Sequence, residues 1–402
     1  MTMLDMLSDR SCWEAFYEYK LSLACPKRFT AELRRFIDGE RYLPVLDAIR
    51  RGERFPLPRR SVISKQHSQK KRVVYTYPPD ENIVLKLLTY LLIRRFGDTF
   101  AAGLYSFRAG VTAKDAIRRL AAVPGVREMY SYKVDVSNYF NSVSIPRLLP
   151  MLGNLIPDDP ELLGFLEALL TEPCVVSDGR IIEEEKGIMA GTPLSAFYAD
   201  LYLSEMDSSF DARRIPSARY SDDIIVFAKT AEEAAEYENE IKRTLGAMGL
   251  AVNPEKESRT LPGEGWDFLG FHYENGRIDI APATVMKLKA KMRRKTRALE
   301  RWKRRTEAGG ERAAKAFIRI FNAKLLENPA DNELTWSCWF FSVINTTASL
   351  HAIDEYAQEC IRFLISGRRT KARFNVRYED MKALGYKSLV HEYYSYKNGP
   401  DA

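Results

Sequence analysis

Two adjacent aspartates within residues 219–228 constrain the fold of this chain more than any other feature. Asp222 and Asp223 follow Tyr220 and directly precede the run Ile-Ile-Val-Phe-Ala, which is typical of a buried strand. The segment therefore predicts a hairpin whose tight turn carries both aspartates. Neighbouring ionised carboxylates repel each other, and a divalent cation such as Mg²⁺ can neutralise them while keeping part of its shell open for a substrate. Because Asp-Asp turns are also common in ordinary hairpins, the dipeptide alone leaves both interpretations open.

The composition and charge of the chain limit the kinds of protein that it can be. The 402 residues are 46% hydrophobic and 29% charged, as in a globular protein, and the formal net charge of +7 indicates a polyanionic partner, most simply a nucleic acid. The five cysteines are dispersed without a Cys-x-x-Cys pair, which disfavours a zinc site and fits a reducing cytoplasm. The most apolar stretch, 83–93, contains Lys86 and is too short to cross a bilayer. We therefore expect a cytoplasmic protein without a membrane segment or signal peptide.

A third acidic residue lies at the end of a second predicted strand. Apolar and polar residues alternate over 130–136, the pattern of a half-buried strand, and Asp135 stands near its end with a turn and an aromatic pair beyond it. A carboxylate in this position is a candidate third ligand for a two-metal site that includes the aspartate pair.

Two basic segments precede this strand. Lys71 and Arg72 begin a β run that ends at two prolines, and a basic strand start suits a triphosphate, since Arg offers a forked set of donors and Lys a point charge. Arg108 and Gly110 lie in a loop before a helix that Thr112 can cap, where a nucleic-acid phosphate can bind. A solvated basic face and a simple turn glycine explain the same residues, so both segments stay open here.

The segment 174–185 predicts a short hairpin with Asp178-Gly179 at its tip. A glycine-containing loop at 186–195 connects this hairpin to a predicted helix at 196–210. Gly187 and Gly191 permit a close approach of the backbone to a ligand, and Pro193 follows them. An ordinary loop before an ordinary helix is the simpler interpretation when this segment is taken alone. Beyond the aspartate hairpin, 231–248 predicts a helix, and 266–271 predicts one short strand with a glycine that allows close contact.

From residue 282 the sequence predicts a long basic helix with a narrow apolar face. The apolar positions are Val285, Leu288, Met292, Leu299 and Trp302. Lys and Arg, among them Lys291 and Arg294, cover the other faces, and Glu300 is the only acid. Such a helix can follow a phosphate backbone, and its binding should weaken steeply with salt. A helix lying on a membrane surface is the alternative, which the narrow apolar face disfavours.

Taken together and in this order, the segments resemble the reverse transcriptases, in particular the bacterial branch related to group II intron enzymes. The resemblance covers roughly 65–275 and rests on five motifs in the order and approximate spacing of the family. These motifs are Asp135 with Phe140, the loop from Gly191 to Pro193, the Tyr-x-Asp-Asp hairpin, the Asn-Pro-Glu-Lys segment that ends at Lys256, and Phe268-Leu269-Gly270.

The resemblance implies an α+β right-hand polymerase fold with helical fingers, an antiparallel palm sheet and a basic helical thumb. We expect an N-terminal helical extension at 1–64, fingers and palm at 65–275, and a thumb with a C-terminal tail at 276–402. The palm would bring Asp135 beside Asp222 and Asp223.

The resemblance also implies a catalytic mechanism and a cofactor. Two Mg²⁺ ions, with Mn²⁺ as the alternative, would bridge the three aspartates, and the backbone carbonyl of Val136 would complete the shell of one. One ion would lower the pKa of the primer 3′-hydroxyl, and the other would neutralise the triphosphate and the leaving pyrophosphate.

Further residues match nucleotide or nucleic-acid contacts of the family. Phe140 matches the aromatic gate that crowds a ribose 2′-hydroxyl, and Lys256 matches a residue suggested to protonate the leaving group. The positions matched to nucleotide binding are Lys71, Arg72, Phe140, Gly191, Pro193 and Lys256. The positions matched to primer or template contacts are Arg108, Phe268, Leu269, Gly270, Lys291 and Arg294.

Two departures from the family pattern narrow the expected function. Leu194 stands where the family often has Gln, and its side chain cannot hydrogen-bond to a nucleotide, which favours a specialised member. The sequence after the thumb resembles neither a DNA-binding nor a His-rich nuclease domain, which disfavours a mobile intron enzyme. We expect an RNA-directed DNA polymerase that uses dNTPs, a DNA primer and a dedicated structured noncoding RNA in antiviral defence. Untemplated or protein-primed DNA synthesis and a non-catalytic RNA-binding or splicing helper are the alternatives.

Overall fold

The computed structural model describes residues 2–23, 25–64, 71–326, 336–368, 370 and 374–399. They divide into two compact units, one formed by Met1–Ser22 with Lys27–Pro262 and the other by Leu23–Pro26 with Gly263–Ala402. The N-terminal helices are thus part of the first unit, and the division falls earlier in the chain than the expected boundary at 275.

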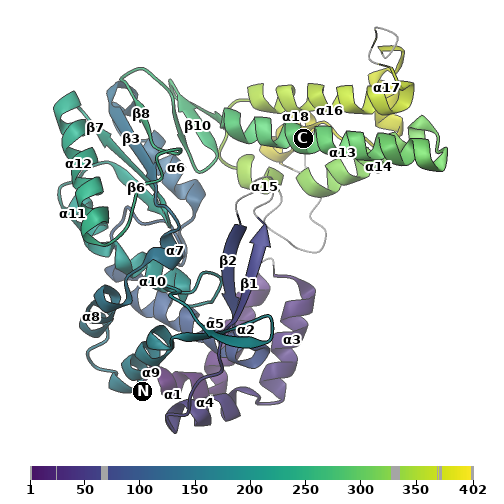
Figure 1. Cartoon of the computed structure of the whole chain (residues 1–402). Coiled ribbons are helices and arrows are strands. Elements are labelled where there is room, and N and C mark those ends of the chain that lie inside the picture. The colour runs from purple at the N-terminus through teal and green to yellow at the C-terminus, as the bar shows by residue number, and fades with distance from the viewer. Residues whose placement is uncertain are drawn as a thin grey trace. The chain divides into compact units, whose positions relative to one another are not determined.

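Five helices form the apolar base of the first unit (Figure 1). They are α1 (Met3–Ser8), α2 (Arg10–Ser22), α3 (Lys27–Asp38), α4 (Tyr42–Arg50) and α5 (Pro79–Phe96). α5 is buried along most of its length because apolar residues occur on nearly all of its sides. The ring of Trp13 lies 5.3 Å from that of Phe36 and 5.0 Å from that of Tyr42, which joins α2, α3 and α4.

The first unit also contains a four-stranded sheet of order β2-β1-β4-β5. Its strands are β1 (Arg59–Ser64), β2 (Lys71–Thr76), β4 (Cys174–Ser177) and β5 (Arg180–Glu183). β1 pairs antiparallel with β2 and parallel with β4. β4 and β5 form the hairpin predicted before the glycine loop, with Asp178 and Gly179 at its tip. β2, which begins at the basic pair, is therefore an edge strand of this sheet.

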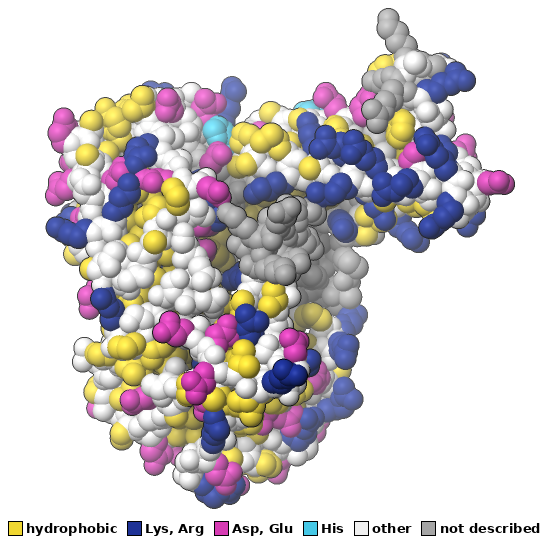
Figure 2. Space-filling model, viewed as in Figure 1, with side chains coloured by type: hydrophobic (Ala, Val, Ile, Leu, Met, Phe, Trp, Pro, Cys, Tyr) yellow, Lys and Arg dark blue, Asp and Glu magenta, His cyan; other side chains and the backbone are white. Residues whose placement is uncertain are grey.

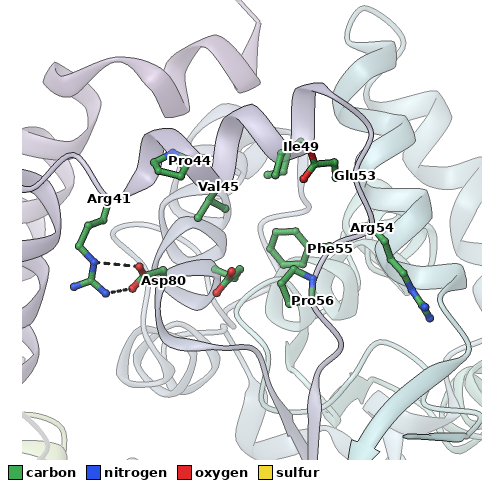
Figure 3. Close-up of a pocket in the computed structure, with 11 residues that line it drawn as sticks. Arg41, Pro44, Val45, Ile49, Glu53, Arg54, Phe55, Pro56 and Asp80 are labelled. Atoms are coloured by element: carbon green, nitrogen blue, oxygen red, sulfur yellow. Dashed lines mark hydrogen bonds and ion pairs between the residues drawn. The ribbon is translucent and has the colours of Figure 1, made fainter.

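A cavity of about 380 Å³ lies between α4 and the start of α5. Figure 3 shows Arg41 and Asp80 joined by an ion pair at one side, with Val45 and Phe55 among the apolar side chains of the wall. None of the three aspartates singled out above lines this cavity. It is separate from the candidate site described below.

The central sheet of the first unit has the order β6-β7-β3-β8, with antiparallel pairing throughout. Its strands are β3 (Tyr130–Asp135), β6 (Ser217–Tyr220), β7 (Asp223–Ala228) and β8 (Ser258–Thr260). All residues of β7 after Asp223 are buried, as the β-branched run predicts. The antiparallel sheet predicted for the palm is therefore present.

Some of the remaining helices of the first unit pack on this sheet, and others pack on the basal helices. The remaining helices are α6 (Ala113–Ala121), α7 (Tyr139–Ser142), α8 (Ile145–Leu155), α9 (Pro160–Thr171), α10 (Ser195–Tyr202), α11 (Ser204–Ala212) and α12 (Ala231–Ala247), with 3-10 turns η1 (Gly97–Thr99) and η2 (Val126–Glu128). α12 packs on β3 and β7, and α6 and α11 pack on β6, whereas α8, α9 and α10 pack on one another and on the basal helices α1 and α5. Thr112 and Asp115 form a capping box on α6, which confirms the predicted cap.

The single helix predicted at 196–210 is wrong, because the chain forms α10 and α11 with a break at Leu203. In a continuous helix the carbonyls of Ala199 and Asp200 would accept hydrogen bonds from the amides four residues later. Both carbonyls instead accept from the guanidinium of Arg219. The buried guanidinium of Arg219, on β6, has thus replaced the hydrogen bonds that would continue the helix.

The second unit contains a three-stranded sheet of order β11-β10-β9 and a layer of helices (Figure 1). Its strands are β9 (Trp266–Phe268), β10 (Phe271–Glu274) and β11 (Arg277–Ile280), and its helices are α13 (Pro282–Thr306), α14 (Gly310–Leu325), α15 (Trp336–Phe340), α16 (Ala348–Ser366), α17 (Tyr378–Ala383) and α18 (Leu389–Asn398). α13 packs on α14 and α16 and confirms the predicted basic helix. Within the described part of the chain, the helices all lack the length and apolar character of a membrane span.

The strand predicted at 266–271 is also wrong, because these residues form two strands of a hairpin. Leu269 and Gly270 make the turn with φ values of 50° and 86°. The amide of Ala281 donates to the carbonyl of Gly270 at 2.9 Å, which ties this turn to the start of α13. The short apolar run could not reveal the turn because a leucine occupies its first position.

Candidate active site

Antiparallel pairing brings the three predicted aspartates to one end of the central sheet. Asp135 is the last residue of β3 and Asp223 the first of β7, and the two are register partners. The amide of Val136 donates to the carbonyl of Asp222 at 2.9 Å, which extends the pairing by one residue. Because opposed residues of antiparallel strands point to the same face, the side chains of Asp135 and Asp223 lie on one side of the sheet.

The turn between β6 and β7 is formed by Ser221 and Asp222, so Asp223 lies in the strand rather than in the predicted turn. Ser221 has a φ of 58°, in the left-handed region that favours glycine. A side chain there costs roughly 1–2 kcal/mol, so other contacts must hold the turn in place. The carbonyl of Ser221 accepts a hydrogen bond of 3.3 Å from Arg219, which is one such contact.

A buried arginine holds the chain beneath this turn. Arg219 is only 1% exposed and forms an ion pair with the buried Asp207, with a shortest distance of 2.6 Å from Nη2 to Oδ2. Its Nη2 also donates to the carbonyl of Asp200 at 2.9 Å, and its Nη1 to the carbonyls of Ala199 and Ser221 at 3.3 Å. One side chain therefore connects α10, α11 and the turn that carries Asp222.

A second buried carboxyl in this cluster accepts its side-chain hydrogen bond from a hydroxyl group. Asp200 accepts a hydrogen bond of 2.6 Å from the hydroxyl of Ser106. Burial raises its pKa to about 7, because the loss of solvation outweighs the attraction of Arg219 and the hydrogen bond from Ser106, and repulsion from Asp207 adds to the increase. In the unfolded chain the group would ionise near its ordinary pKa of 3.8.

This shift predicts a pH dependence of stability. Between about pH 4 and pH 7 the folded chain binds more protons at Asp200 than the unfolded chain, so this group lowers stability as the pH rises. Asp200→Asn keeps an acceptor for Ser106 and removes the charge. We expect the free energy of unfolding in urea to fall less between pH 5 and pH 8 in this variant than in the wild type. An identical fall in both proteins would contradict the assignment.

Burial and neighbouring charges shift the pKa of two candidate catalytic residues, Asp222 and Asp223. Burial raises the pKa of Asp223 to about 6, with further repulsion from Asp222 and then Asp135. Burial and repulsion from Asp135 also raise the pKa of Asp222, while Lys256 and Arg72 lower it. The basic residue of β2 therefore lies close enough to act on the aspartate turn. Carboxylates that raise one another's pKa favour binding of a cation.

Lys256 supplies a positive charge beside Asp135. Its ammonium forms an ion pair with the carboxylate of Asp135, although the lysine side chain is 54% exposed. Partial burial lowers the pKa of Lys256, but the interaction with Asp135 outweighs this and raises it above its usual value. The amide of Asn253 donates to the carbonyl of Asp135 at 2.8 Å, and its side chain donates to Oδ1 at 3.3 Å.

The three carboxylates suit a divalent cation by chemistry, although they do not surround a single point. Across the described residues, no group of three or more His, Cys, Asp or Glu side chains is arranged so that it could hold a metal ion as it stands. Asp135 is turned toward Lys256 and Asn253 instead. Carboxylate oxygens are nevertheless the donors that Mg²⁺ prefers, and the mutual repulsion of the group would be relieved by a cation. The three carboxylates therefore fit a divalent cation once Asp135 gives up its ion pair with Lys256 and binds the metal instead.

The glycine loop lies between α7 and β2. A Cβ atom on Gly187 would overlap the carbonyl oxygen of Phe140, so only glycine permits this contact. Gly191 has a φ of 99°, and a Cβ there would lie 3.1 Å from the carbonyl oxygen of Tyr75. The amide of Tyr75 donates to the carbonyl of Ala190 at 2.8 Å. The loop thus joins the predicted aromatic gate to the strand that begins with the basic pair.

The residue at the usual glutamine position belongs to the core. Leu194 is 3% exposed and precedes the first residue of α10, where it packs in the main apolar cluster. Pro193 beside it is half-buried. The hydroxyl of Ser195 donates to the carbonyl of Thr192 at 2.7 Å, which fixes the entry to the helix. A side chain at position 194 therefore serves packing in this chain.

The structure describes the side chain of Arg108 but not that of Lys71. The guanidinium of Arg108 donates to the carbonyls of Ala101 and Leu104 at 2.9 and 3.1 Å, so it braces its own loop. A contact with nucleic acid stays a prediction for this residue. Lys71 begins β2, and its side chain lies outside the described part of the chain.

The other predicted nucleic-acid contacts belong to the second unit. Phe268 is buried at the end of β9, and Leu269 and Gly270 form the turn that follows. Lys291 and Arg294 are exposed on α13. Figure 2 shows Lys and Arg side chains gathered along the helices of this unit. These features fit a surface for phosphates, and the individual contacts stay predictions.

Sequence reasoning missed the buried polar cluster of Arg219, Asp207, Asp200 and Ser106. An arginine before a strand residue usually indicates a solvent-exposed position, and no periodic pattern links it to an aspartate twelve positions earlier. One available signal was Asp200, which stands within the apolar run from Ala196 to Leu203. Buried charges of this kind require a partner.

A family model described as reverse transcriptase (RNA-dependent DNA polymerase) matches residues 63–273, more than half of the chain. This chain belongs to the reverse transcriptase family. The match confirms the α+β right-hand polymerase fold class, and the family it identifies consists of RNA-directed DNA polymerases, which are nucleotidyltransferases. Reverse transcriptases generally use divalent metal ions, in agreement with the donor set described above.

Solved structures similar to this reverse transcriptase include fungal telomerases. A truncated apo telomerase of Candida tropicalis is 12% identical with a TM-score of 0.47, and the match covers 56% of this chain and 55% of that one. Telomerase of Candida albicans in complex with a fragment of telomeric RNA is 12% identical with a TM-score of 0.46, and the match covers 83% and 64%. The apo telomerase of Candida tropicalis is 11% identical with a TM-score of 0.47, covering 83% and 69%. The chain thus spans less than two thirds of the first two structures, and no curated protein matches it.

Proposed function

We propose that this reverse transcriptase copies an RNA template into DNA by adding deoxynucleotides to a primer 3′-hydroxyl at the end of the β6-β7-β3-β8 sheet. The observation that carries the proposal is the gathering of Asp135, Asp222 and Asp223 at that end. Burial and mutual repulsion raise the pKa of Asp222 and Asp223, so the group favours a positive counter-charge. Phosphoryl transfer needs such a charge, because the reacting triphosphate is a polyanion.

Asp135, Asp222 and Asp223 would hold two Mg²⁺ ions, with Mn²⁺ as the alternative, and the carbonyl of Val136 would add a ligand to one of them. When bound, these ions supply a lowered pKa at the primer hydroxyl and neutralise charge on the triphosphate and pyrophosphate. Lys256 is paired with Asp135 in the protein alone. Release of that pairing would leave its ammonium free to protonate the leaving pyrophosphate.

The remaining nucleotide contacts would come from β2, α7 and the glycine loop. Lys71 and Arg72 would bind the triphosphate, and the influence of Arg72 on the pKa of Asp222 supports this role. Gly191 and Pro193 would form the wall beside the nucleotide, because the loop packs directly on β2. Phe140 would crowd the ribose 2′ position.

Phe140→Ala is therefore expected to relax the choice of sugar. Removing the ring opens space for a 2′-hydroxyl, so the kcat/KM for a ribonucleotide relative to its deoxynucleotide should rise roughly 10- to 100-fold. Single-nucleotide addition with dGTP and GTP measures this ratio. Phe140→Tyr keeps the bulk and is the matched control. A ratio that stays at the wild-type value in Phe140→Ala would exclude Phe140 as the gate.

The primer and template would be bound by basic and backbone groups. Arg108 would contact one strand from the first unit, and the turn at Phe268, Leu269 and Gly270 would hold the primer. Lys291 and Arg294 on α13 would bind phosphates, which the net charge of +7 supports. Affinity for a primer–template should accordingly fall steeply as salt rises.

A biological role in antiviral defence, with a dedicated structured noncoding RNA as template, completes the proposal. The burial of Leu194 supports a specialised member, since the position often occupied by glutamine contributes no polar contact to a nucleotide. A cytoplasmic location is supported by the five free cysteines, which fit a reducing compartment.

Primer extension tests the function directly. The purified chain is incubated with Mg²⁺, four dNTPs and an RNA template with an annealed DNA primer, and the product is sequenced. We expect a DNA strand complementary to the template. A product unrelated to the RNA, or one attached to the protein, would instead indicate untemplated or protein-primed synthesis. Absence of any product with bound RNA would favour the non-catalytic interpretation.

A further inference from the structure

An exposed phenylalanine is held in an unfavourable backbone conformation beside the candidate catalytic turn. Phe107 has a φ of 51°, and its side chain remains 39% exposed. Its ring lies 6.4 Å from the ring of Tyr220, which is two residues before Asp222. Positive φ values are unusual for a bulky residue, and such positions cluster at functional sites.

The segment that precedes Phe107 is anchored to β6 by backbone hydrogen bonds. The amide of Tyr105 donates to the carbonyl of Arg219 at 2.9 Å, and the amide of Arg219 donates to the carbonyl of Gly103 at 2.8 Å. The segment before Phe107 therefore lies beside β6, with one isolated parallel bridge between Leu104 and Arg219. The exposed ring is presented by a fixed backbone.

Both side chains that flank Phe107 form hydrogen bonds within the protein. Ser106 is fully buried and donates to Asp200, and Arg108 donates to two carbonyls of its own loop. Phe107 alone among these three neighbours is classed as exposed. Partial burial against Tyr220 does not account for the placement of a large apolar ring in a strained and solvent-exposed position.

We propose that Phe107, with Tyr220 behind it, forms an apolar step against which the end of the primer–template duplex packs. This inference rests on the proposed polymerase function, which places the reacting primer end at Asp222. The ring carries no charge and no hydrogen-bonding group, so it fits the apolar faces of bases and sugars and gives a contact independent of sequence. The partner is thus a nucleic-acid duplex end, and the contact positions the primer terminus.

Replacement by glycine separates a binding role from a structural one. Phe107→Gly removes the ring and relieves the strain of the positive φ, so this variant should be at least as stable as the wild type. We expect its Kd for a primer–template with a dideoxy-terminated primer to rise about tenfold or more, because one stacking contact is lost. Phe107→Tyr should retain wild-type affinity, and Leu21→Ala, at an exposed apolar position on α2, is the control.

Fluorescence anisotropy of the labelled duplex measures the affinity, and thermal unfolding measures stability. Wild-type affinity in Phe107→Gly would overturn the inference, as would an equal loss of affinity in Leu21→Ala. The binding assay does not require catalysis, so it is independent of the polymerase assay. If the wild-type protein extends primers and Phe107→Gly binds the duplex with wild-type affinity, only the proposed contact of Phe107 is refuted. If the wild-type protein extends no primer, the proposed function is refuted.

Discussion

Asp223→Asn and Asp222→Asn are each expected to lower the rate of nucleotide addition by roughly three orders of magnitude or more, because each removes a charge that must balance metal ions in the transition state. The fold should persist. Burial and repulsion raise the pKa of Asp223 to about 6, which means that its charged form is disfavoured in the protein alone. Neutral variants should therefore unfold at the same or a higher temperature than the wild type.

Single-turnover primer extension and thermal unfolding measure these two effects on the same samples. Asp178→Asn is a matched control, because it makes the same chemical change at the exposed tip of the β4–β5 hairpin. It should leave both rate and stability unchanged. If Asp222→Asn and Asp223→Asn polymerise within tenfold of the wild type, the assignment of the site is wrong.

The second large effect is expected from the buried ion pair of Arg219 and Asp207. Arg219→Met leaves the Asp207 carboxylate buried without its cation, and it removes the donors to the carbonyls of Ala199, Asp200 and Ser221. The free energy of unfolding should fall by about 3–5 kcal/mol. The rate of nucleotide addition should fall as well, because the Ser221 carbonyl beside Asp222 loses a hydrogen bond.

Urea unfolding of three proteins tests this interpretation. The double variant Arg219→Met with Asp207→Leu removes both charges and should be more stable than Arg219→Met alone. Arg213→Ala breaks a more exposed pair with Glu240 and should cost only about 0–1 kcal/mol. A loss in Arg219→Met no larger than that in Arg213→Ala would show that the buried pair does not hold the turn.

The sequence predicted those features of the fold that depend on local pattern. The alternation over 130–136 placed Asp135 at a strand end, and the β-branched run after Asp223 predicted a buried strand, which is β7. Asp178-Gly179 predicted a hairpin because these residues accept the required turn conformation. Each of these features is set by residues that are neighbours in the chain.

The sequence did not predict features that depend on distant partners. The helix predicted at 196–210 breaks at Leu203 because Arg219, on another strand, takes the carbonyls of Ala199 and Asp200. Asp223 lies in β7 rather than in the turn because its register partner is Asp135. No pattern along the chain indicates either pairing.

The same distinction applies to the candidate site. The motif order identified the three aspartates and Lys256, and the structure gathers them through the pairing of β3 with β7 and the contacts of Asn253. The ion pair between Lys256 and Asp135 was not expected, since the sequence gives the residues but no distance between them. The sequence also did not single out Phe107, because the positive φ of this residue is a property of the folded loop alone.

Counting bound metal ions decides whether the three aspartates form a metal site. Mn²⁺ is titrated into the protein with a dideoxy-terminated primer–template and the next dNTP, and free Mn²⁺ is followed by electron paramagnetic resonance. We expect two ions bound per chain in the wild type, fewer in Asp135→Asn and Asp223→Asn, and the wild-type number in Asp178→Asn. Equal binding by all four proteins would contradict a metal site built from these carboxylates.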